Sequence, residues 1–162
     1  MNTKIKTAFS VFIYLALSVT AFAAETVRFK FVSPSQLSVG ERFQVQLRID
    51  PASQGISEVP FVIGYDPAVF EVQSVKAGGF LSAGSLFQPS VDNVEGRIRV
   101  DVSAHDPSLH PQSDVLAIMY FKVARRFAST SIVGLTMAPV DTDGNGLPVD
   151  YPATLHIRNR SR

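Results

Sequence analysis

The sequence predicts an all-β protein, an antiparallel β-sandwich, and three observations carry that prediction. Pro and Gly interrupt the chain about every ten residues after residue 24, with β-branched and aromatic runs between them, a spacing typical of sandwiches and barrels. Two of these runs alternate strictly between apolar and polar residues, which is the period of a half-buried strand. We find no helix start followed by an apolar period of about 3.6 residues.

The first element is a predicted secretory signal at residues 1–23. Two lysines precede an apolar run at residues 8–19, and small residues at 21–23 mark a cleavage site before Ala24. The apolar run is shorter than the roughly 20 residues that a membrane-spanning helix needs, so cleavage is favoured over an uncleaved anchor. We therefore expect an exported protein, secreted or periplasmic, with no membrane span after cleavage.

Residues 24–162 are expected to form one domain. Without the two lysines of the signal, 13 basic residues stand against 14 acidic ones, so the mature chain is near neutral. A near-neutral chain lacks the excess of basic residues that is typical of a nucleic-acid-binding protein. The chain has no Cys, which excludes thiol catalysis, thiolate metal sites and attachment through an acylated Cys.

The strands are expected at regular intervals along this domain. Residues 27–31 and 43–49 show the strict alternation, and residues 56–65 are apolar on both faces, as in a central strand. Asp66-Pro67 makes a turn, and a Gly-rich loop follows the extended residues 69–75. The run at 115–123 is long enough for a helix, but its β-branched and aromatic residues favour a buried strand. Further strands are expected at residues 98–102, 132–137 and 155–157.

Several of these segments, taken in order, resemble the cohesin domain. The resemblance rests on an extended strand that enters Tyr-Asp-Pro and is followed by an apolar-Glu-apolar strand, and it covers nearly all of residues 26–158. The segments that carry it are Val39-Gly40-Glu41, Gly55-Ile56 through Phe61, Tyr65-Asp66-Pro67, Phe70-Glu71-Val72 with Val75, Gly96-Arg97-Ile98, and Leu116 to Phe121.

The resemblance implies a nine-stranded jelly-roll sandwich that binds a protein and catalyses no reaction. Cohesin domains hold partners that carry a dockerin, a small calcium-loaded module, through one face of the sandwich. Placing the sequence on the family pattern puts partner-facing positions near Glu58, Pro60, Val91 and His105. Pro60 and Val91 depart from the polar residues that are common there in dockerin-binding members.

Arg99 and Phe87 are further candidate partner-binding residues. Phe87 and Phe80 lie in the Gly-rich stretch, where they would form an exposed apolar patch or cap an open end of the sandwich. The expected partner is a protein, either dockerin-like or a component of the cell envelope.

The alternative is a carbohydrate-binding module on the same fold, which would recognise polysaccharide. Such modules stack exposed aromatic rings on sugars. The mature chain has no Trp and only Tyr65, Tyr120 and Tyr151.

One local motif suggests calcium, and no other cofactor is expected. Asp141, Asp143 and Asn145 place oxygen ligands at alternate positions with Gly146 at the sixth, as in the first half of a calcium loop. The twelfth position, where a bidentate Glu is expected, is Pro152. The alternative is a tight turn between two strands, since Asp, Asn and Gly tolerate positive φ.

Catalytic and zinc motifs are missing from the sequence. His105, His110 and His156 include no pair with the one-face spacing of a zinc motif, and His156 is expected to face solvent on the last strand. No Gly-x-Ser-x-Gly elbow is present. The acidic residues Glu58, Glu71, Glu95 and Asp101 are read as solvated charges. We expect no catalytic residues.

Overall fold

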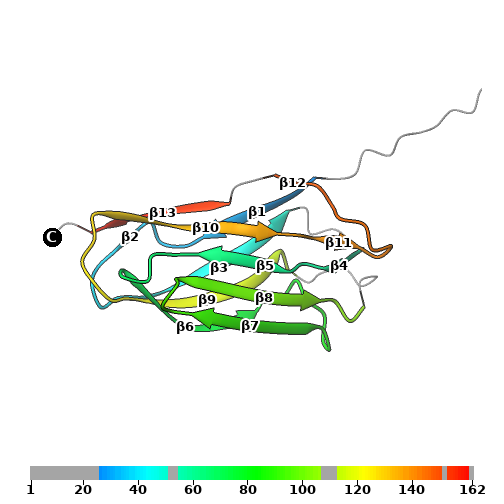
Figure 1. Ribbon diagram of the computed structural model, residues 1–162, viewed down its shortest axis with the longest axis horizontal. Coiled ribbons are helices and arrows are strands. Elements are labelled where there is room, and N and C mark those ends of the chain that lie inside the picture. The colour runs from blue at the N-terminus through cyan, green and yellow to red at the C-terminus, as the bar shows by residue number, and fades with distance from the viewer. Residues whose placement is uncertain (1–25, 51–54, 107–112, 151–152, 161–162) are drawn as a thin grey trace, which may run out of the picture.

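The computed structural model describes residues 26–50, 55–106, 113–150 and 153–160, and it confirms the all-β prediction. Two sheets pack face to face as a sandwich (Figure 1). The predicted signal at residues 1–23 lies outside the described residues, as do His110, Tyr151 and Pro152. In the described part of the chain no helix is long and apolar enough to cross a membrane.

The first sheet, sheet A, has the strand order β12-β1-β3-β9-β6. Its long strands pair antiparallel, whereas the two-residue β12 pairs parallel with β1. The strands are β1 (Val27–Val32), β3 (Arg42–Asp50), β6 (Phe70–Ala77), β9 (Val115–Val123) and β12 (Val149–Asp150).

The second sheet, sheet B, contains the remaining eight strands, and in Figure 1 β13, β10, β5, β8 and β7 run side by side across the molecule. The two-residue β2 pairs parallel with β13, and the other pairs are antiparallel. The strands are β2 (Gln36–Leu37), β4 (Ile56–Glu58), β5 (Phe61–Gly64), β7 (Leu86–Asp92), β8 (Arg97–Ser103), β10 (Ser129–Met137), β11 (Val140–Asp141) and β13 (Thr154–Asn159).

The strand count agrees with the expected nine once the shortest pieces are set aside. Nine of the thirteen strands have four or more residues. The expected strand at residues 56–65 is divided into β4 and β5 by Val59 and Pro60, because Pro60 has no N–H to give to a ladder. The long apolar run at residues 115–123 is the buried strand β9, as expected.

β7 has no counterpart among the strands expected from the sequence, which places Phe87 in the Gly-rich stretch and predicts no strand at residues 88–92. Within the described residues it pairs with β8 alone, most of its side chains are exposed, and the usual alternation is lost. Pro89, in the middle of β7, is tolerated at such an edge position.

The core between the sheets is apolar, and no polar side chain is buried among the described residues. Phe43, Phe70 and Phe121 form an aromatic cluster with ring centroids 5.3, 5.4 and 5.9 Å apart. Aromatic pairs of this kind contribute about 0.5–1.5 kcal/mol each beyond the area they bury.

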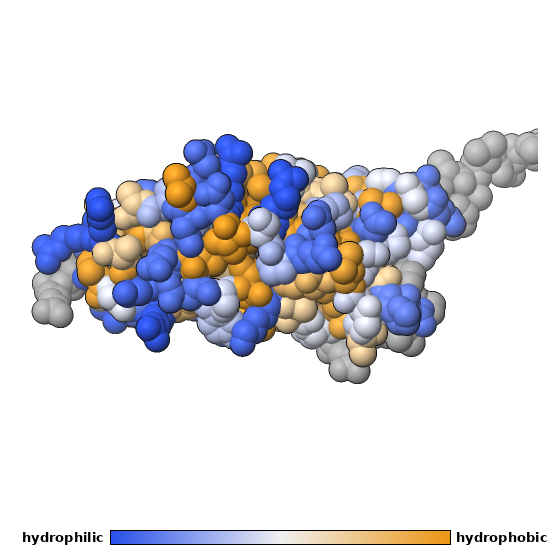
Figure 2. Space-filling view, turned by 60° about the horizontal axis from the view of Figure 1, so that its bottom comes forward, coloured by the Kyte–Doolittle hydropathy of each residue, from blue (hydrophilic) through white to orange (hydrophobic). Residues whose placement is uncertain are grey.

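The core reaches the surface where the edge strands β6 and β7 run along the same side of the molecule. Figure 2 looks onto this side and shows hydrophobic residues gathered between hydrophilic ones. Phe80 is buried, and Phe87 is half-buried and packs against the core. The two rings therefore cap the sandwich rather than form an exposed patch.

Candidate functional site

The outer face of sheet B, formed by β7, β8, β5 and β10, is the face on which the expected partner-binding residues can be tested. Residues paired directly across neighbouring strands share one side of a sheet. Val62 in β5 pairs with Arg99 in β8 and with Thr136 in β10, so these three side chains lie together on the outer face. Ser90 of β7 pairs with Arg99 and extends the same row.

A β-bulge in β10, the last of these four strands, raises an apolar residue on this face. Gly134 pairs with Ile63 and Thr136 pairs with Val62, which leaves Leu135 as the extra residue of β10. The Leu135 side chain is 51% exposed. It lies over Gly64, where an added Cβ would be only 3.0 Å from Leu135 Cδ1. The missing side chain at Gly64 therefore makes room for Leu135 on the sheet.

Charged residues lie on one side of this apolar residue, along β8. Arg97, Arg99 and Asp101 alternate along β8 with buried residues, and all three are exposed. The half-buried Val62 and Val133 flank Leu135. An exposed apolar centre within a charged rim is the usual composition of a protein-binding surface.

Three of the expected residues lie at or on this face. Arg99 is on it, beside Val62. Glu58 pairs with Ser103 and is exposed at the end of β8. His105 follows that same end, where its backbone N–H donates to Ser85 Oγ at 3.0 Å. The structure therefore brings Glu58 and His105 to one end of the outer face.

The other expected residues lie elsewhere. Phe87 pairs with Val102 and Val91 pairs with Ile98, and both partners are buried, so Phe87 and Val91 are on the inner side of β7. They belong to the edge beside β6 and not to the outer face of sheet B. Pro60 is half-buried at the break between β4 and β5.

The sequence reasoning did not identify Leu135. No spacing in the sequence marks it, because Val133, Leu135 and Met137 alternate as in a regular strand, which would place Leu135 on the same side as the buried Met137. The bulge follows only from the pairing of β10 with β5.

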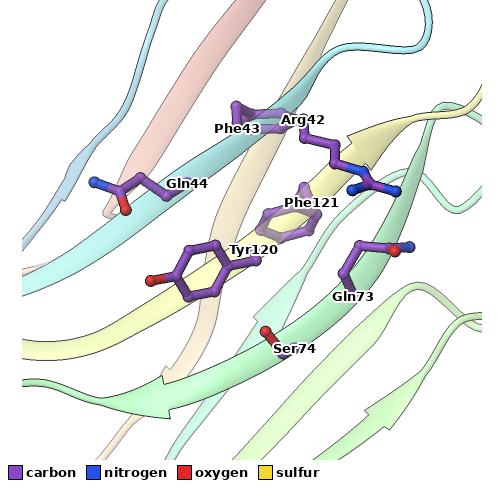
Figure 3. A pocket seen from close by; sticks show the side chains of 7 residues that line it. All are labelled: Arg42, Phe43, Gln44, Gln73, Ser74, Tyr120 and Phe121. Carbon is purple, nitrogen blue, oxygen red and sulfur yellow. The ribbon is translucent and has the colours of Figure 1, made fainter.

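A hollow of about 480 Å³ lies on the opposite side of the molecule, on the outer face of sheet A (Figure 3). Tyr120 of β9 pairs with Gln44 of β3 and with Ser74 of β6, and Figure 3 shows its ring between them. The other lining residues are Arg42, Phe43, Gln73 and Phe121. Tyr65, in contrast, is buried, so Tyr120 is the half-exposed tyrosine of the described residues.

Asn93 connects the two sheets at the turn between β7 and β8. Its Oδ1 accepts hydrogen bonds from the Tyr65 hydroxyl at 2.7 Å and from the Val72 N–H at 2.9 Å. Burial, with the nearby Asp92 carboxylate, raises the pKa of Tyr65 to about 12. Tyr65 is therefore a neutral hydrogen-bond donor at ordinary pH.

The Asp141 motif forms a turn between β11 and β12. The Asp141 carboxylate accepts the N–H groups of Asp143 at 2.9 Å and Asn145 at 2.8 Å, which holds its pKa below the usual range. Gly144 has a φ of +83°. The described residues contain no group of three or more His, Asp or Glu arranged to hold a metal. Calcium binding at Asp141, Asp143 and Asn145 stays a prediction, which calorimetric titration with calcium would test.

Comparisons with known proteins agree on one family. The cohesin domain model matches residues 27–155. Among curated proteins, none matches the chain by sequence.

Several solved structures share the fold at low sequence identity. One is a type I cohesin–dockerin complex from Clostridium thermocellum, with TM-score 0.72, 18% identity and 84% of this chain matched to 100% of that one. Another is a cohesin bound to a dockerin from Acetivibrio cellulolyticus, with TM-score 0.73, 19% identity and coverages of 84% and 100%. A third is a non-cellulosomal cohesin from Archaeoglobus fulgidus, with TM-score 0.67, 23% identity and coverages of 83% and 92%.

Proposed function

The chain belongs to the cohesin domain family of protein-binding modules, and on that premise we propose that it binds a protein partner through the outer face of sheet B. Cohesin domains are non-catalytic, and we propose that this chain likewise works by binding alone. We further propose that residues 1–23 are cleaved as a secretory signal and that residues 24–162 act outside the cytoplasm. The match to the family model begins at residue 27, just after this segment.

The proposal rests on the exposure of the Leu135 side chain on this face. An exposed leucine on a sheet face is unfavourably solvated in the free protein, and its burial becomes favourable when a partner covers it. Central apolar anchors inside a polar rim account for most of the affinity of protein interfaces. Arg99 and Arg97 would supply the rim, with Glu58 and His105 at one end.

The partner class we propose is a dockerin-like module. The Clostridium thermocellum and Acetivibrio cellulolyticus cohesins are each seen with a dockerin. Pro60 replaces a polar residue that is common in dockerin-binding cohesins, so we expect a partner that differs from ordinary dockerins at the contact near Pro60.

The experiment is affinity capture with residues 24–162 as bait, from envelope and culture-supernatant extracts, with calcium and with chelator. The bait is compared with Leu135→Asp and with Val39→Asp. Val39 is also 51% exposed but lies in the turn before β3, so it is a matched control for an added charge. A calcium-dependent partner retained by the Val39 variant and lost with Leu135→Asp supports the proposal.

Calorimetry with the purified partner then measures the contribution of each residue. Replacing a central anchor costs about 2 kcal/mol or more, so we expect Leu135→Asp to weaken binding by about thirtyfold. Glu58→Ala and His105→Ala should weaken it less, since both lie at the rim. A partner that binds the Leu135 variant as tightly as the wild type would place the interface elsewhere and overturn the proposal.

A further inference from the structure

The hollow on sheet A is formed by a β-bulge in β6. Val72 pairs with Phe121 and Ser74 pairs with Tyr120, which leaves Gln73 as the extra residue. Gln73 is exposed, and the Arg42 side chain extends toward it from β3 across β9 (Figure 3). The hollow therefore combines an aromatic ring with a guanidinium, a hydroxyl and two amides from three neighbouring strands.

Positive charge is concentrated around this hollow. Arg42 pairs directly with Lys122 of β9, and like charges in directly opposite positions are destabilising. The Lys76 ammonium lies over one face of the Tyr120 ring, 5.4 Å from its centre. Glu71 faces Lys122 from β6, but within the described residues Arg42 and Lys76 take part in no ion pair.

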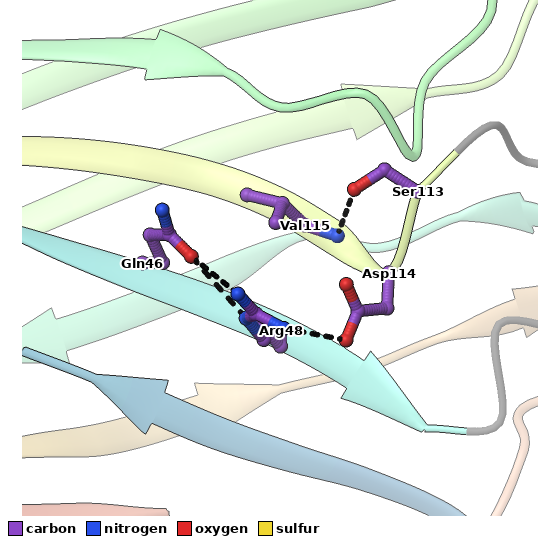
Figure 4. Close-up of polar contacts among 5 residues, drawn as sticks. All are labelled: Gln46, Arg48, Ser113, Asp114 and Val115. Atoms are coloured by element: carbon purple, nitrogen blue, oxygen red, sulfur yellow. Dashed lines mark hydrogen bonds and ion pairs between the residues drawn. The ribbon is translucent and has the colours of Figure 1, made fainter.

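A second like-charge pair on the same face shows how such a pair can be neutralised. Lys30 pairs directly with Arg48. Arg48 Nη1 lies 3.2 Å from Asp114 Oδ2, and the Arg48 guanidinium also donates to Gln46 Oε1 at 2.9 and 3.2 Å (Figure 4). Among the described residues Arg42 forms no ion pair like that of Arg48 with Asp114, so its cation is free to meet an anion in the hollow.

These groups match the chemistry of an acidic sugar. The face of an aromatic ring stacks on the apolar C–H face of a pyranose, and amide and hydroxyl side chains bond sugar hydroxyls. Arg bonds carboxylates with two parallel N–H groups. A bare phosphate would use the cations but not the ring. We propose that the hollow binds a uronate residue of an acidic polysaccharide, with Tyr120 against the sugar ring and Arg42 on its carboxylate.

The site is separate from the face proposed for the protein partner. Arg42, Gln73 and Tyr120 are on the outer side of sheet A, whereas Leu135 is on the outer side of sheet B. One molecule could therefore hold an acidic polysaccharide and a protein partner at the same time, and the two activities can be lost independently.

The test is calorimetric titration of residues 24–162 with a galacturonate trisaccharide and with its neutral galactose counterpart. We expect binding of the acidic sugar only. Arg42→Gln and Tyr120→Ala should each lower the affinity by about tenfold, and Tyr120→Phe should keep most of it because the ring remains. Arg158→Gln, on the exposed side of β13, makes the same charge change on the other sheet and should leave the affinity unchanged.

Thermal unfolding of each variant checks that it is folded. Absence of binding to the galacturonate trisaccharide would overturn the proposal. Equal binding of the neutral sugar would also overturn it, as would equal losses for Arg42→Gln and Arg158→Gln, because those results indicate unspecific contacts or charge attraction alone. Retention of affinity in a folded Tyr120→Ala variant would exclude the stacking role.

Discussion

One β-bulge on each outer face of the sandwich leaves a single residue unpaired, and the two bulges have opposite results. In β6 the extra residue is Gln73, and the face beside it is hollowed. In β10 the extra residue is Leu135, and the face there carries an exposed apolar side chain. The residues next to the extra side chain determine whether the face is hollowed or raised. Gly64 leaves space for Leu135 to lie on the sheet, whereas Gln73 has Tyr120 and Arg42 near it with a gap between them.

The two bulges also differ in the hydrogen bonds that stabilise them. β10 pairs with β5 across its bulge, and on the other side the Gly134 N–H next to the bulge donates to the Ala153 carbonyl at 2.9 Å. β6 is an edge strand, and the Val72 N–H at its bulge donates to the Asn93 side chain from the other sheet. The β10 bulge thus has backbone hydrogen bonds on both sides, whereas the β6 bulge is paired with β9 on one side and relies on one side chain on the other.

The largest expected effect comes from Asn93→Ala, which tests this dependence. The change leaves the Val72 N–H without its acceptor and the Tyr65 hydroxyl with only the Asp92 carbonyl at 3.2 Å, which costs about 1–3 kcal/mol of unfolding free energy. Urea denaturation measures the loss. Asn93→Asp keeps an oxygen acceptor and should lose less. If the two variants were equally stable, the edge bulge would not depend on the acceptor.

Tyr65→Phe should have the next effect, because it removes the hydroxyl that supports Asn93. We expect a loss of about 1 kcal/mol at neutral pH. The pKa of Tyr65 is about 12 in the folded protein, above the ordinary value of 10.0. Its contribution is therefore complete below about pH 10 and lost as the pH rises toward 12.

Urea denaturation at several pH values checks this. The stability difference between wild type and Tyr65→Phe should shrink across that window. A constant difference would indicate that the hydroxyl keeps the same pKa on unfolding.

Two matched substitutions compare what Arg48 and Arg42, two cations on the outer face of sheet A, contribute to stability. Arg48→Gln removes a half-exposed ion pair with Asp114 and should cost about 0.2–1 kcal/mol. Arg42→Gln removes repulsion with Lys122 and should leave the stability unchanged or slightly higher. Denaturation at low and high salt measures both. Losses of equal size would mean that Arg42 is neutralised in the fold, which would weaken the case for an anionic ligand there.

Gly64→Ala is expected to change stability least while affecting the proposed binding face. The added Cβ would be 3.0 Å from the flexible end of Leu135, so Leu135 must shift, while alanine suits a strand better than glycine. We expect a net change within about 0.5 kcal/mol. Calorimetry with the protein partner should show weaker binding. Unchanged affinity would mean that the position of Leu135 on Gly64 does not matter.

The sequence predicted those parts of the fold that follow from alternation. Residues 27–31 and 43–49 have one apolar side, and they form β1 and β3 as expected. β7 was missed because an edge strand exposed on both sides has no such pattern. Arg99 could be proposed as an exposed strand residue, but its position beside Val62 depends on pairing between distant strands.

Only the β6 bulge is marked in the sequence. Val72 and Val75 are three residues apart and both face the interior, and that spacing indicates an extra residue in the strand. In β10 the regular alternation of Val133, Leu135 and Met137 hides the bulge. The sequence cannot distinguish a hollow from a raised side chain, because that depends on Tyr120 in one case and on Gly64 in the other, far away in the chain.

The free edges of β6 and β7 also affect whether copies of the protein associate with one another at high concentration. Unpaired strand edges invite a strand from another molecule, and natural proteins guard against this with prolines, bulges and lysines. β7 has Pro89 at its middle, and β6 has its bulge and Lys76. Neither edge offers an unbroken row of hydrogen-bonding groups. These two edges should therefore resist pairing with strands of other molecules, even at high local concentration.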